Sequence, residues 1–277
     1  MKTYLTLSLL ILTSVSCSDS GNHSNAKYDV DCCTCNYKDN QKPCADSILV
    51  VSDNNMGSIP NKVAENVQYP SVYIDETHTL KLYYPNFSKI DLVCGKMPDK
   101  SDDSVIMVCA AAYTVKRMDT FSHSNIIGDH IASGKRYSGT PSDTYRGAFT
   151  YYNGAPHFTY DNWVKEFSEA VENGGCGFAQ DMMIHEGMIT NYWRKKNSET
   201  EFRALCQIDD KIAIVDSKGP RKFGEFVNDL HELGVQEAIY LDMGGWKHSW
   251  YRNSENQPID IYKNPNKYAT NWITFYK

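Results

Sequence analysis

The chain has 277 residues, which is enough for one large domain or two small ones. Its net charge is −6 and it contains no basic run, so its composition argues against a nucleic-acid partner. Tyrosine and tryptophan are plentiful, at 19 and 5 residues, which fits a large core and would also suit stacking against sugars.

The amino terminus resembles a bacterial secretion signal. Lys2 gives a positive start, and Leu5 to Leu12 form an apolar stretch shorter than the roughly 20 residues that cross a bilayer. Small residues precede Cys17, as in a lipobox. We expect residues 1–16 to be a signal peptide and Cys17 to carry a lipid. The chain would then be an exported outer-membrane lipoprotein, periplasmic or surface-exposed, that meets the membrane only through this anchor. The alternative is ordinary secretion with Cys17 unmodified.

Residues 17–46 read as a lipid-anchored, cysteine-containing tether, because residues 18–30 are polar, rich in serine and asparagine, and without periodicity. An even number of cysteines in an exported protein favours disulfides. Zinc is the rival interpretation for the first group, although its spacing is not that of two Cys-x-x-Cys knuckles. The second group lies in or beside apolar runs and fits buried free thiols equally well. The two groups are Cys32, Cys33, Cys35 and Cys44, then Cys94, Cys109, Cys176 and Cys206.

Residues 47–277 read as one continuous domain. Short runs of branched and aromatic residues bounded by turn formers predict strands. They are residues 47–53, 79–84, 89–95 and 104–114. Asp161 is placed to cap a helix that carries Trp163, Phe167 and Ala170 on one face and ends at Gly174.

The second half of the domain contains clearer signals. Residues 175–190 predict a hairpin that turns at His185-Glu186-Gly187, and residues 202–208 predict a strand. Apolar residues at three- and four-residue steps predict a helix over 223–233, with strands over 211–216 and 236–243 on either side. We expect an α+β fold: a single mixed α/β domain with a twisted, mainly antiparallel sheet flanked by a few helices.

Asp242 stands where the last of these strands ends. A carboxylate there is costly to desolvate unless it is paired or partly wet, and ligands collect where strands stop pairing. Gly244 and Gly245 would let a ligand approach the backbone, and rings with one cation would wall the pocket. The wall residues are Trp246, His248, Trp250, Tyr251 and Arg252. The alternative is a tight turn in which Asp242 caps the backbone and the aromatic side chains pack.

Three other places carry candidate residues. Asp181 interrupts the apolar hairpin and would supply a second acid for glycosidic cleavage, or else faces solvent on an edge strand. Arg203 starts a strand and is suited to bidentate capture of phosphate or carboxylate, although a surface ion pair is the commoner use. A glycine-punctuated loop holds His123, Asn125, Asp129 and His130. Its spacing matches no standard metal site, so a polar binding loop or structural histidines fit better.

Taken in order over residues 104–252, these segments resemble the phosphodiester glycosidase family, that of the mannose 6-phosphate uncovering enzyme, and within it the bacterial lipoprotein branch. The resemblance rests on the order of the segments: a strand ending in Ala111-Ala112-Tyr113, a glycine-punctuated loop, a Met-Met-Ile-His-Glu-Gly hairpin, an arginine strand, a strand ending in Asp216, a helix, and a strand ending in Asp-x-Gly-Gly.

The resemblance implies hydrolysis of a sugar-1-phosphodiester, of the N-acetylglucosamine-1-phosphodiester type, or of a related envelope or host glycan. Arg203 matches the family's strand arginine and would bind phosphate, and Asp242 would be the catalytic acid/base or an orienting carboxylate. Asp181 matches only loosely, as a third catalytic candidate. We expect substrate contacts from Gly244, Gly245, Trp246, Arg252, His130, Asn125, His185 and Tyr113. We expect no cofactor and no assigned metal site, and leave a divalent cation open.

Two departures from the family pattern support an alternative function. Ala111-Ala112 replaces the usual Asn-Gly, while Met243 and Trp246 replace a glycine and a serine of the signature. A glycan-binding surface lipoprotein without turnover is therefore the main alternative, and a structural envelope protein is a third.

Overall fold

The computed structural model describes residues 71–115, 120–192, 199–243, 248–262 and 269–277. The predicted signal peptide, the tether with its cysteines, the lipidation site Cys17 and the predicted strand at 47–53 lie outside these residues. Within them the chain forms seventeen strands, two α-helices and one short 3-10 helix.

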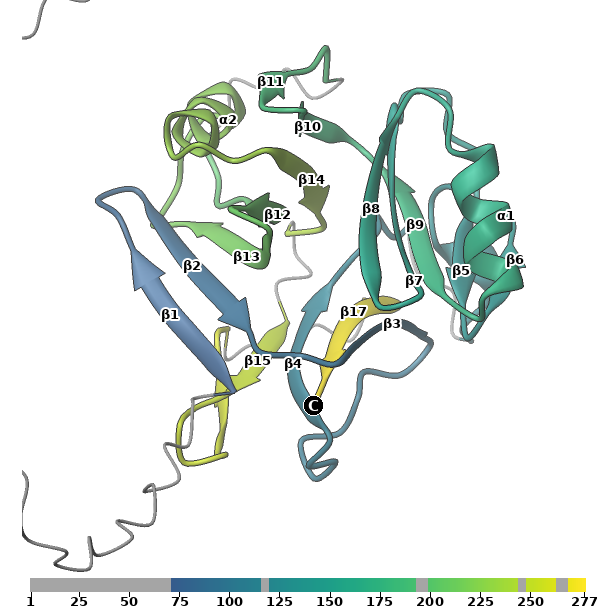
Figure 1. The fold of residues 1–277 in the computed structure, drawn as a ribbon, viewed down its shortest axis with the longest axis horizontal. Coiled ribbons are helices and arrows are strands. Elements are labelled where there is room, and N and C mark those ends of the chain that lie inside the picture. Colours follow the sequence, from purple (N-terminus) through teal and green to yellow (C-terminus); the bar gives the residue numbers. More distant parts are fainter. Residues whose placement is uncertain (1–70, 116–119, 193–198, 244–247, 263–268) are drawn as a thin grey trace, which may run out of the picture. The chain divides into compact units, whose positions relative to one another are not determined.

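The largest sheet has seven strands, and every neighbouring pair in it is antiparallel. Its central strand β12 pairs with β13 on one side and β14 on the other (Figure 1). Across the sheet the order is β1 (Val72–Glu76), β2 (Leu80–Pro85), β13 (Lys211–Ser217), β12 (Arg203–Ile208), β14 (Glu237–Leu241), β10 (Met182–His185) and β11 (Met188–Ile189).

Two five-stranded antiparallel sheets complete the fold. One has the order β16 (Pro258–Asp260), β15 (Ser249–Arg252), β4 (Val105–Ala110), β17 (Asn271–Tyr276) and β3 (Lys89–Cys94). The other has the order β6 (Lys135–Tyr137), β5 (His130–Ala132), β9 (Cys176–Gln180), β7 (Gly147–Tyr152) and β8 (Ala155–Tyr160).

Helix α2 (Phe223–Glu232) forms where the periodicity predicts it, and Gly234 follows it at φ 84°, a left-handed conformation suited to glycine. Helix α1 (Val164–Glu172) also forms, but its N-cap is Trp163. The expectation that Asp161 caps α1 is wrong, because Asp161 is itself left-handed at φ 68° and bonds to Arg146. The 3-10 helix spans His123–Asn125.

The fold class needs one correction. A single domain with mainly antiparallel sheets is present, but the described residues are predominantly β rather than a balanced α+β mixture. Many strands escape the sequence analysis, among them the β7–β8 hairpin, whose turn is Asn153-Gly154. Both turn residues have positive φ, which makes Asn-Gly between two apolar runs the signal that identifies this hairpin.

The predicted unit of strand, helix and strand is confirmed, but a third strand, β12, lies between its two strands. Strands β13 and β14 both run antiparallel to β12, which lies between them, so they are parallel to each other. Helix α2 connects them and packs its apolar face, including Phe226 and Leu230, on that part of the sheet. This connection brings the end of β14, and therefore Asp242, to the middle of the largest sheet.

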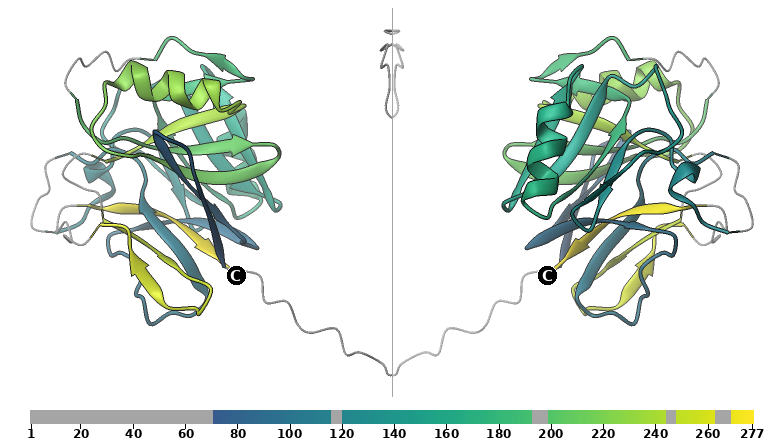
Figure 2. Two further views of the ribbon diagram at one scale, coloured as in Figure 1. Left: turned by 90° about the vertical axis from the view of Figure 1, so that its left-hand side faces the viewer. Right: turned by 90° about the vertical axis from the view of Figure 1, so that its right-hand side faces the viewer.

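One hydrophobic cluster joins all three sheets. It contains Tyr83 and Ile239 from the seven-stranded sheet, Ile273 from the sheet of β4, and Phe149 and Phe178 from the sheet of β9. Figure 2 shows the three sheets from two further sides. Because the cluster is continuous, the described residues share a core to which each sheet contributes one face.

The four cysteines in the described residues are free thiols, and three of them are buried. This agrees with the buried-thiol alternative for Cys109, Cys176 and Cys206, whereas Cys94 is a free thiol that is partly exposed. Among the described residues, no helix combines the length and the apolar character needed to cross a membrane.

Candidate functional site

Asp242 lies where two sheets meet. It follows β14, and its backbone N–H donates to the carbonyl of Ala111, which follows β4, at 2.8 Å. Its side chain is 3% exposed, and Oδ2 accepts a bond from the Thr114 backbone N–H at 3.4 Å. The carboxylate predicted at a strand end is thus buried at the junction of β14 with the segment after β4.

Asp181 reaches the same end of β14. It stands between β9 and β10, where the chain leaves one sheet and enters another, and it is 1% exposed. The carbonyl of Asp181 accepts from the backbone N–H of Tyr240 at 2.9 Å, two residues before Asp242. Two carboxylate residues far apart in sequence therefore lie at one strand end, which is an arrangement that acid–base chemistry can use.

Several tyrosine rings pack near this end of β14. The ring of Tyr113 lies 5.3 Å from that of Tyr240 and 5.9 Å from that of Tyr145, measured between centroids. Burial and then the charge of Asp181 raise the pKa of Tyr192. Tyr113, predicted as a substrate contact, thus packs on Tyr240, two residues before Asp242.

Arg203 is fully buried and holds Asp216 on the neighbouring strand. Nε and Nη2 donate to the two carboxylate oxygens of Asp216, each at 2.6 Å. Burial alone would lower the pKa of Arg203, but the charge and hydrogen bonds of Asp216, together with Cys109 and Tyr262, raise it. Arg203 lies opposite Leu241, the residue before Asp242. Its third nitrogen, Nη1, forms no hydrogen bond with any residue that the structure describes.

The Arg203–Asp216 pair is the charged centre of a buried polar cluster. The guanidinium carbon lies 5.6 Å from the ring centroid of Tyr262. Burial, and next the charge of Asp216, raise the pKa of both Tyr83 and Tyr262. Burial also raises the pKa of the Cys109 thiol to about 12, so these three groups stay protonated at neutral pH.

Two predicted contacts lie far from Asp242. Arg252 donates to the carbonyl of Val105 at the start of β4, six residues and roughly 20 Å from Ala111. Its guanidinium also donates to the carbonyls of Lys100, Asp102 and Asn256. His185 bonds Glu237 at the start of β14, five residues and roughly 16 Å from Asp242. The structure therefore brings neither of them to the two carboxylates.

The predicted polar loop runs beside the site rather than into it. The carbonyl of Asn125 accepts from the backbone N–H of Val115 at 2.8 Å, and the Asn125 side chain accepts from Ser122 within the loop. His130 is buried with its ring next to that of His123. Burial lowers the pKa of His130 to about 4, so its ring is neutral at neutral pH. Gly244, Gly245 and Trp246 lie outside the described residues, so their contacts stay predictions.

Two further polar side chains lie at this site, and neither is among the residues predicted from the sequence. Asn271, which begins β17, accepts from the Ala112 backbone N–H at 2.7 Å and donates to the Ala112 carbonyl at 3.0 Å. Asn271 thus places a buried side-chain amide beside Ala111-Ala112, which have no polar side chain of their own. Gln180 is fully buried next to Asp181, and its Nε2 bonds no residue in the described part of the chain. A polar residue at the edge of an apolar run is the only sequence signal for either.

Neither of two cavities in the described residues is lined by Asp181 or Asp242. One of about 460 Å³ is lined by Gly95, Phe121, His248 and Thr270 among others. Thr270 bonds Thr114, which donates to Asp242, so this cavity lies one residue away from the site. A second cavity of about 980 Å³ lies at the β12–β13 turn and is lined by Tyr73, Tyr84, Phe87 and Tyr151 among others.

Comparisons with known proteins bear on the fold. No family profile and no curated protein sequence matches the chain. The catalytic domain of zebrafish N-acetylglucosamine-1-phosphodiester alpha-N-acetylglucosaminidase, auto-inhibited by its pro-peptide, is similar in structure, with a TM-score of 0.50 at 11% identity over 76% of this chain and 83% of that one. A hypothetical protein from Synechocystis gives a TM-score of 0.43 at 11% identity over 74% of this chain and 61% of that one. The first likeness shows a distant relationship in fold to a phosphodiester glycosidase catalytic domain.

Proposed function

We propose that this chain is a hydrolase that cleaves a sugar-1-phosphodiester, of the N-acetylglucosamine-1-phosphodiester type. The observation that carries the proposal is the convergence of Asp181 and Asp242 at one end of β14. The fold likeness to a catalytic domain named for this substrate supports it.

Export with a lipid on Cys17 belongs to the proposal and rests on the amino-terminal sequence alone. Loss of the protein from the membrane fraction after Cys17→Ser is its check.

The chemistry needs one carboxylate that handles a proton and donors that hold the phosphate. Water adds to the anomeric carbon as the bond from that carbon to the phosphate oxygen breaks, and the phosphate leaves with the electron pair. A carboxylate at Asp242 or Asp181 accepts the proton that water loses. A phosphomonoester is a stable leaving group, so stabilising its charge matters more than protonating it.

Two buried donors come from residues near Asp242 and Asp181 along the backbone. Arg203 is paired across strands with the neighbour of Asp242, and Gln180 is the neighbour of Asp181 in sequence. Each keeps a nitrogen that bonds no described residue, Nη1 in Arg203 and Nε2 in Gln180. Buried donors without partners are costly, and phosphate oxygens would satisfy them. In this proposal Asp216 fixes the Arg203 guanidinium so that Nη1 alone faces the phosphate.

The test is release of N-acetylglucosamine from UDP-N-acetylglucosamine and from an alkyl ester of N-acetylglucosamine-1-phosphate, measured by chromatography with the full chain. We expect Asp242→Asn to lower the rate at least about 100-fold, since it removes acid–base function while keeping the shape. Asp103→Asn is the matched control, because Asp103 is exposed and lies two residues before β4, at the end remote from Ala111. No release by the wild type, or equal rates for wild type and Asp242→Asn, would sink the proposal.

A second candidate is a glycan-binding protein without turnover. The observation that favours it is the cavity of about 980 Å³, whose wall contains four aromatic rings, with Tyr73 57% exposed. Exposed rings stack on sugar faces. Calorimetry on the same compounds separates the two candidates: binding without product that weakens in Tyr84→Ala selects the second.

A further inference from the structure

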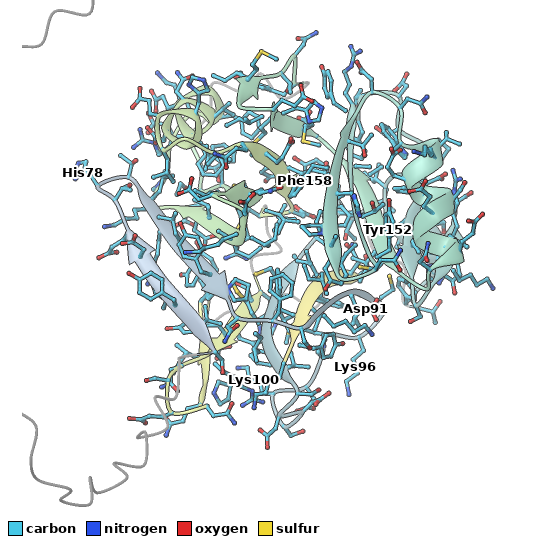
Figure 3. The ribbon with its side chains drawn as sticks, in the orientation of Figure 1. His78, Asp91, Lys96, Lys100, Tyr152 and Phe158 are labelled. Atoms are coloured by element: carbon cyan, nitrogen blue, oxygen red, sulfur yellow. The ribbon has the colours of Figure 1, made fainter. Side chains whose placement is uncertain are left out.

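Three separate elements bring a thiol and two imidazoles together. Cys94 ends β3, His123 begins the 3-10 helix, and His130 begins β5. One ligand atom from each residue lies within 4.8 Å of the other two. Figure 3 labels Asp91, which lies within β3, and Lys96, which follows Cys94 by two residues.

The hydrogen bonds around His130 turn one nitrogen toward the cluster. Nδ1 lies 3.3 Å from the carbonyl of Gly128, and since a carbonyl only accepts, Nδ1 carries the proton. Nε2 therefore carries the lone pair, which accepts a hydrogen bond from Nδ1 of His123 at 2.8 Å. A metal ion bound to both nitrogens would take the place of that hydrogen bond and its proton. A histidine whose other nitrogen donates to a backbone carbonyl is the usual arrangement in metal sites.

The His123 ring is held in place by its neighbours. It stacks on Tyr137 with centroids 3.4 Å apart and planes 8° apart, and the ring of Phe121 meets it edge-on at 5.2 Å. Gly95, next to Cys94, has φ 90°, and a Cβ built there would lie 3.2 Å from the Phe121 ring. The glycine thus lets Phe121 pack closely over this end of β3.

The oxygen ligands of the same loop are engaged elsewhere. Asp129 pairs with Arg136, and the Asn125 side chain accepts from the Ser122 backbone. The set that remains is one sulfur and two nitrogens. Such a set suits zinc and does not suit magnesium or calcium, which prefer oxygen ligands.

We propose that Cys94, His123 and His130 bind one zinc ion. The Cys94 thiol loses its proton to solvent as sulfur binds the metal, and the two imidazoles bind as neutral rings. With Zn–N bonds of about 2.0 Å, tetrahedral geometry separates the two nitrogens by about 3.3 Å, so the rings move apart by about 0.5 Å from their present contact. Solvent takes the fourth position.

The ion has a path to the site and a structural consequence. Cys94 and His123 are partly exposed, and the cavity of about 460 Å³ begins at Gly95 and Phe121. The loop that carries His123 also bonds Val115 through the carbonyl of Asn125. Zinc would therefore tie this loop to β3 and, through it, brace the segment that follows β4.

The experiment is a cobalt titration of the full chain after chelator treatment under reducing conditions. Cysteines 17, 32, 33, 35 and 44 are all replaced by serine, so that the amino-terminal thiols cannot bind the metal. We expect one equivalent of Co²⁺ to produce a thiolate-to-cobalt charge-transfer band that Zn²⁺ abolishes. In that background Cys94→Ser loses the band, and His123→Ala weakens metal binding roughly 100-fold.

His157→Ala is the control, because His157 also stacks on a tyrosine, Tyr152, but lies outside the cluster. It should leave cobalt binding unchanged. Circular dichroism checks that each variant is folded, and if Cys94→Ser is not, the more exposed His123→Ala decides. The proposal is overturned if only the chain with its amino-terminal cysteines binds cobalt, or if the band survives in Cys94→Ser. Neither result depends on the proposed hydrolysis.

Discussion

At the scale of single residues, the pairing of Arg203 with Asp216 changes what the arginine can do. Both strands are central, and both charged side chains are buried, so each needs the other. Arg252 is similarly engaged, by four backbone carbonyls. Two arginines that the sequence offers for substrate binding are therefore also part of the protein's own packing.

Removing one partner of the buried pair should destabilise the protein strongly. We expect Arg203→Met to lower the free energy of unfolding by about 3–5 kcal/mol, because Asp216 is left charged and buried. The double variant Arg203→Met, Asp216→Leu should recover much of that loss. Urea denaturation measures both. Lys89→Ala, which breaks an exposed pair with Asp91, is the control and should cost at most about 1 kcal/mol. Equal losses in the single and double variants would contradict this account.

At the scale of elements, the switch of the chain between sheets positions Asp181. Strand β9 pairs with β7, β10 pairs with β14, and Asp181 is the single residue between β9 and β10. Gly147, which begins β7, lies against this switch: a Cβ built there would lie 2.5 Å from the Cβ of Met182. The close approach of β7 to Met182 thus depends on a residue without a side chain.

We expect Gly147→Ala to lower the free energy of unfolding by about 1–3 kcal/mol, since Met182 and its strand must move to make room. The amide resonances of Gln180, Asp181 and Met182 should shift with it, which NMR measures. Thr159→Ala on the adjacent β8 is the control and should leave both quantities nearly unchanged. Resonances that stay in place in Gly147→Ala would show that the switch tolerates a side chain.

At the scale of the whole described part of the chain, the three sheets share one core, so none has its own. Ile273 and Phe178 belong to different five-stranded sheets and to the same buried cluster. Such a core favours unfolding in a single cooperative step.

Urea unfolding followed by far-UV circular dichroism and by tryptophan fluorescence should give coincident transitions. Ile273→Ala and Phe178→Ala should each shift that one transition, by about 2–5 kcal/mol, because each leaves a cavity in the shared core. Lys211→Ala, at an exposed strand end, is the control. Two separate transitions, with each variant affecting only one, would mean that the sheets unfold independently.

Much of the local structure could be predicted because its signals are local. The apolar periodicity of residues 223–233 and the branched runs on either side identify α2, β13 and β14 without any tertiary information. The β7–β8 hairpin has only the Asn153-Gly154 turn as its local signal, and unpredicted strands such as these make the fold richer in β structure than expected.

Local sequence patterns suffice to place Asp242 at the end of a core strand and Arg203 at the start of another, and to predict strand, helix and strand over residues 211–243. Which side chains meet depends on the packing of the sheets. Asp181 lies at the same strand end as Asp242, and Arg203 binds Asp216. Cys94 lies with His123 and His130, whereas Asp129, which is next to His130 in sequence, is not part of that cluster. The physical reason is that periodicity and turn chemistry act over a few residues, whereas these contacts depend on how three sheets pack around one core.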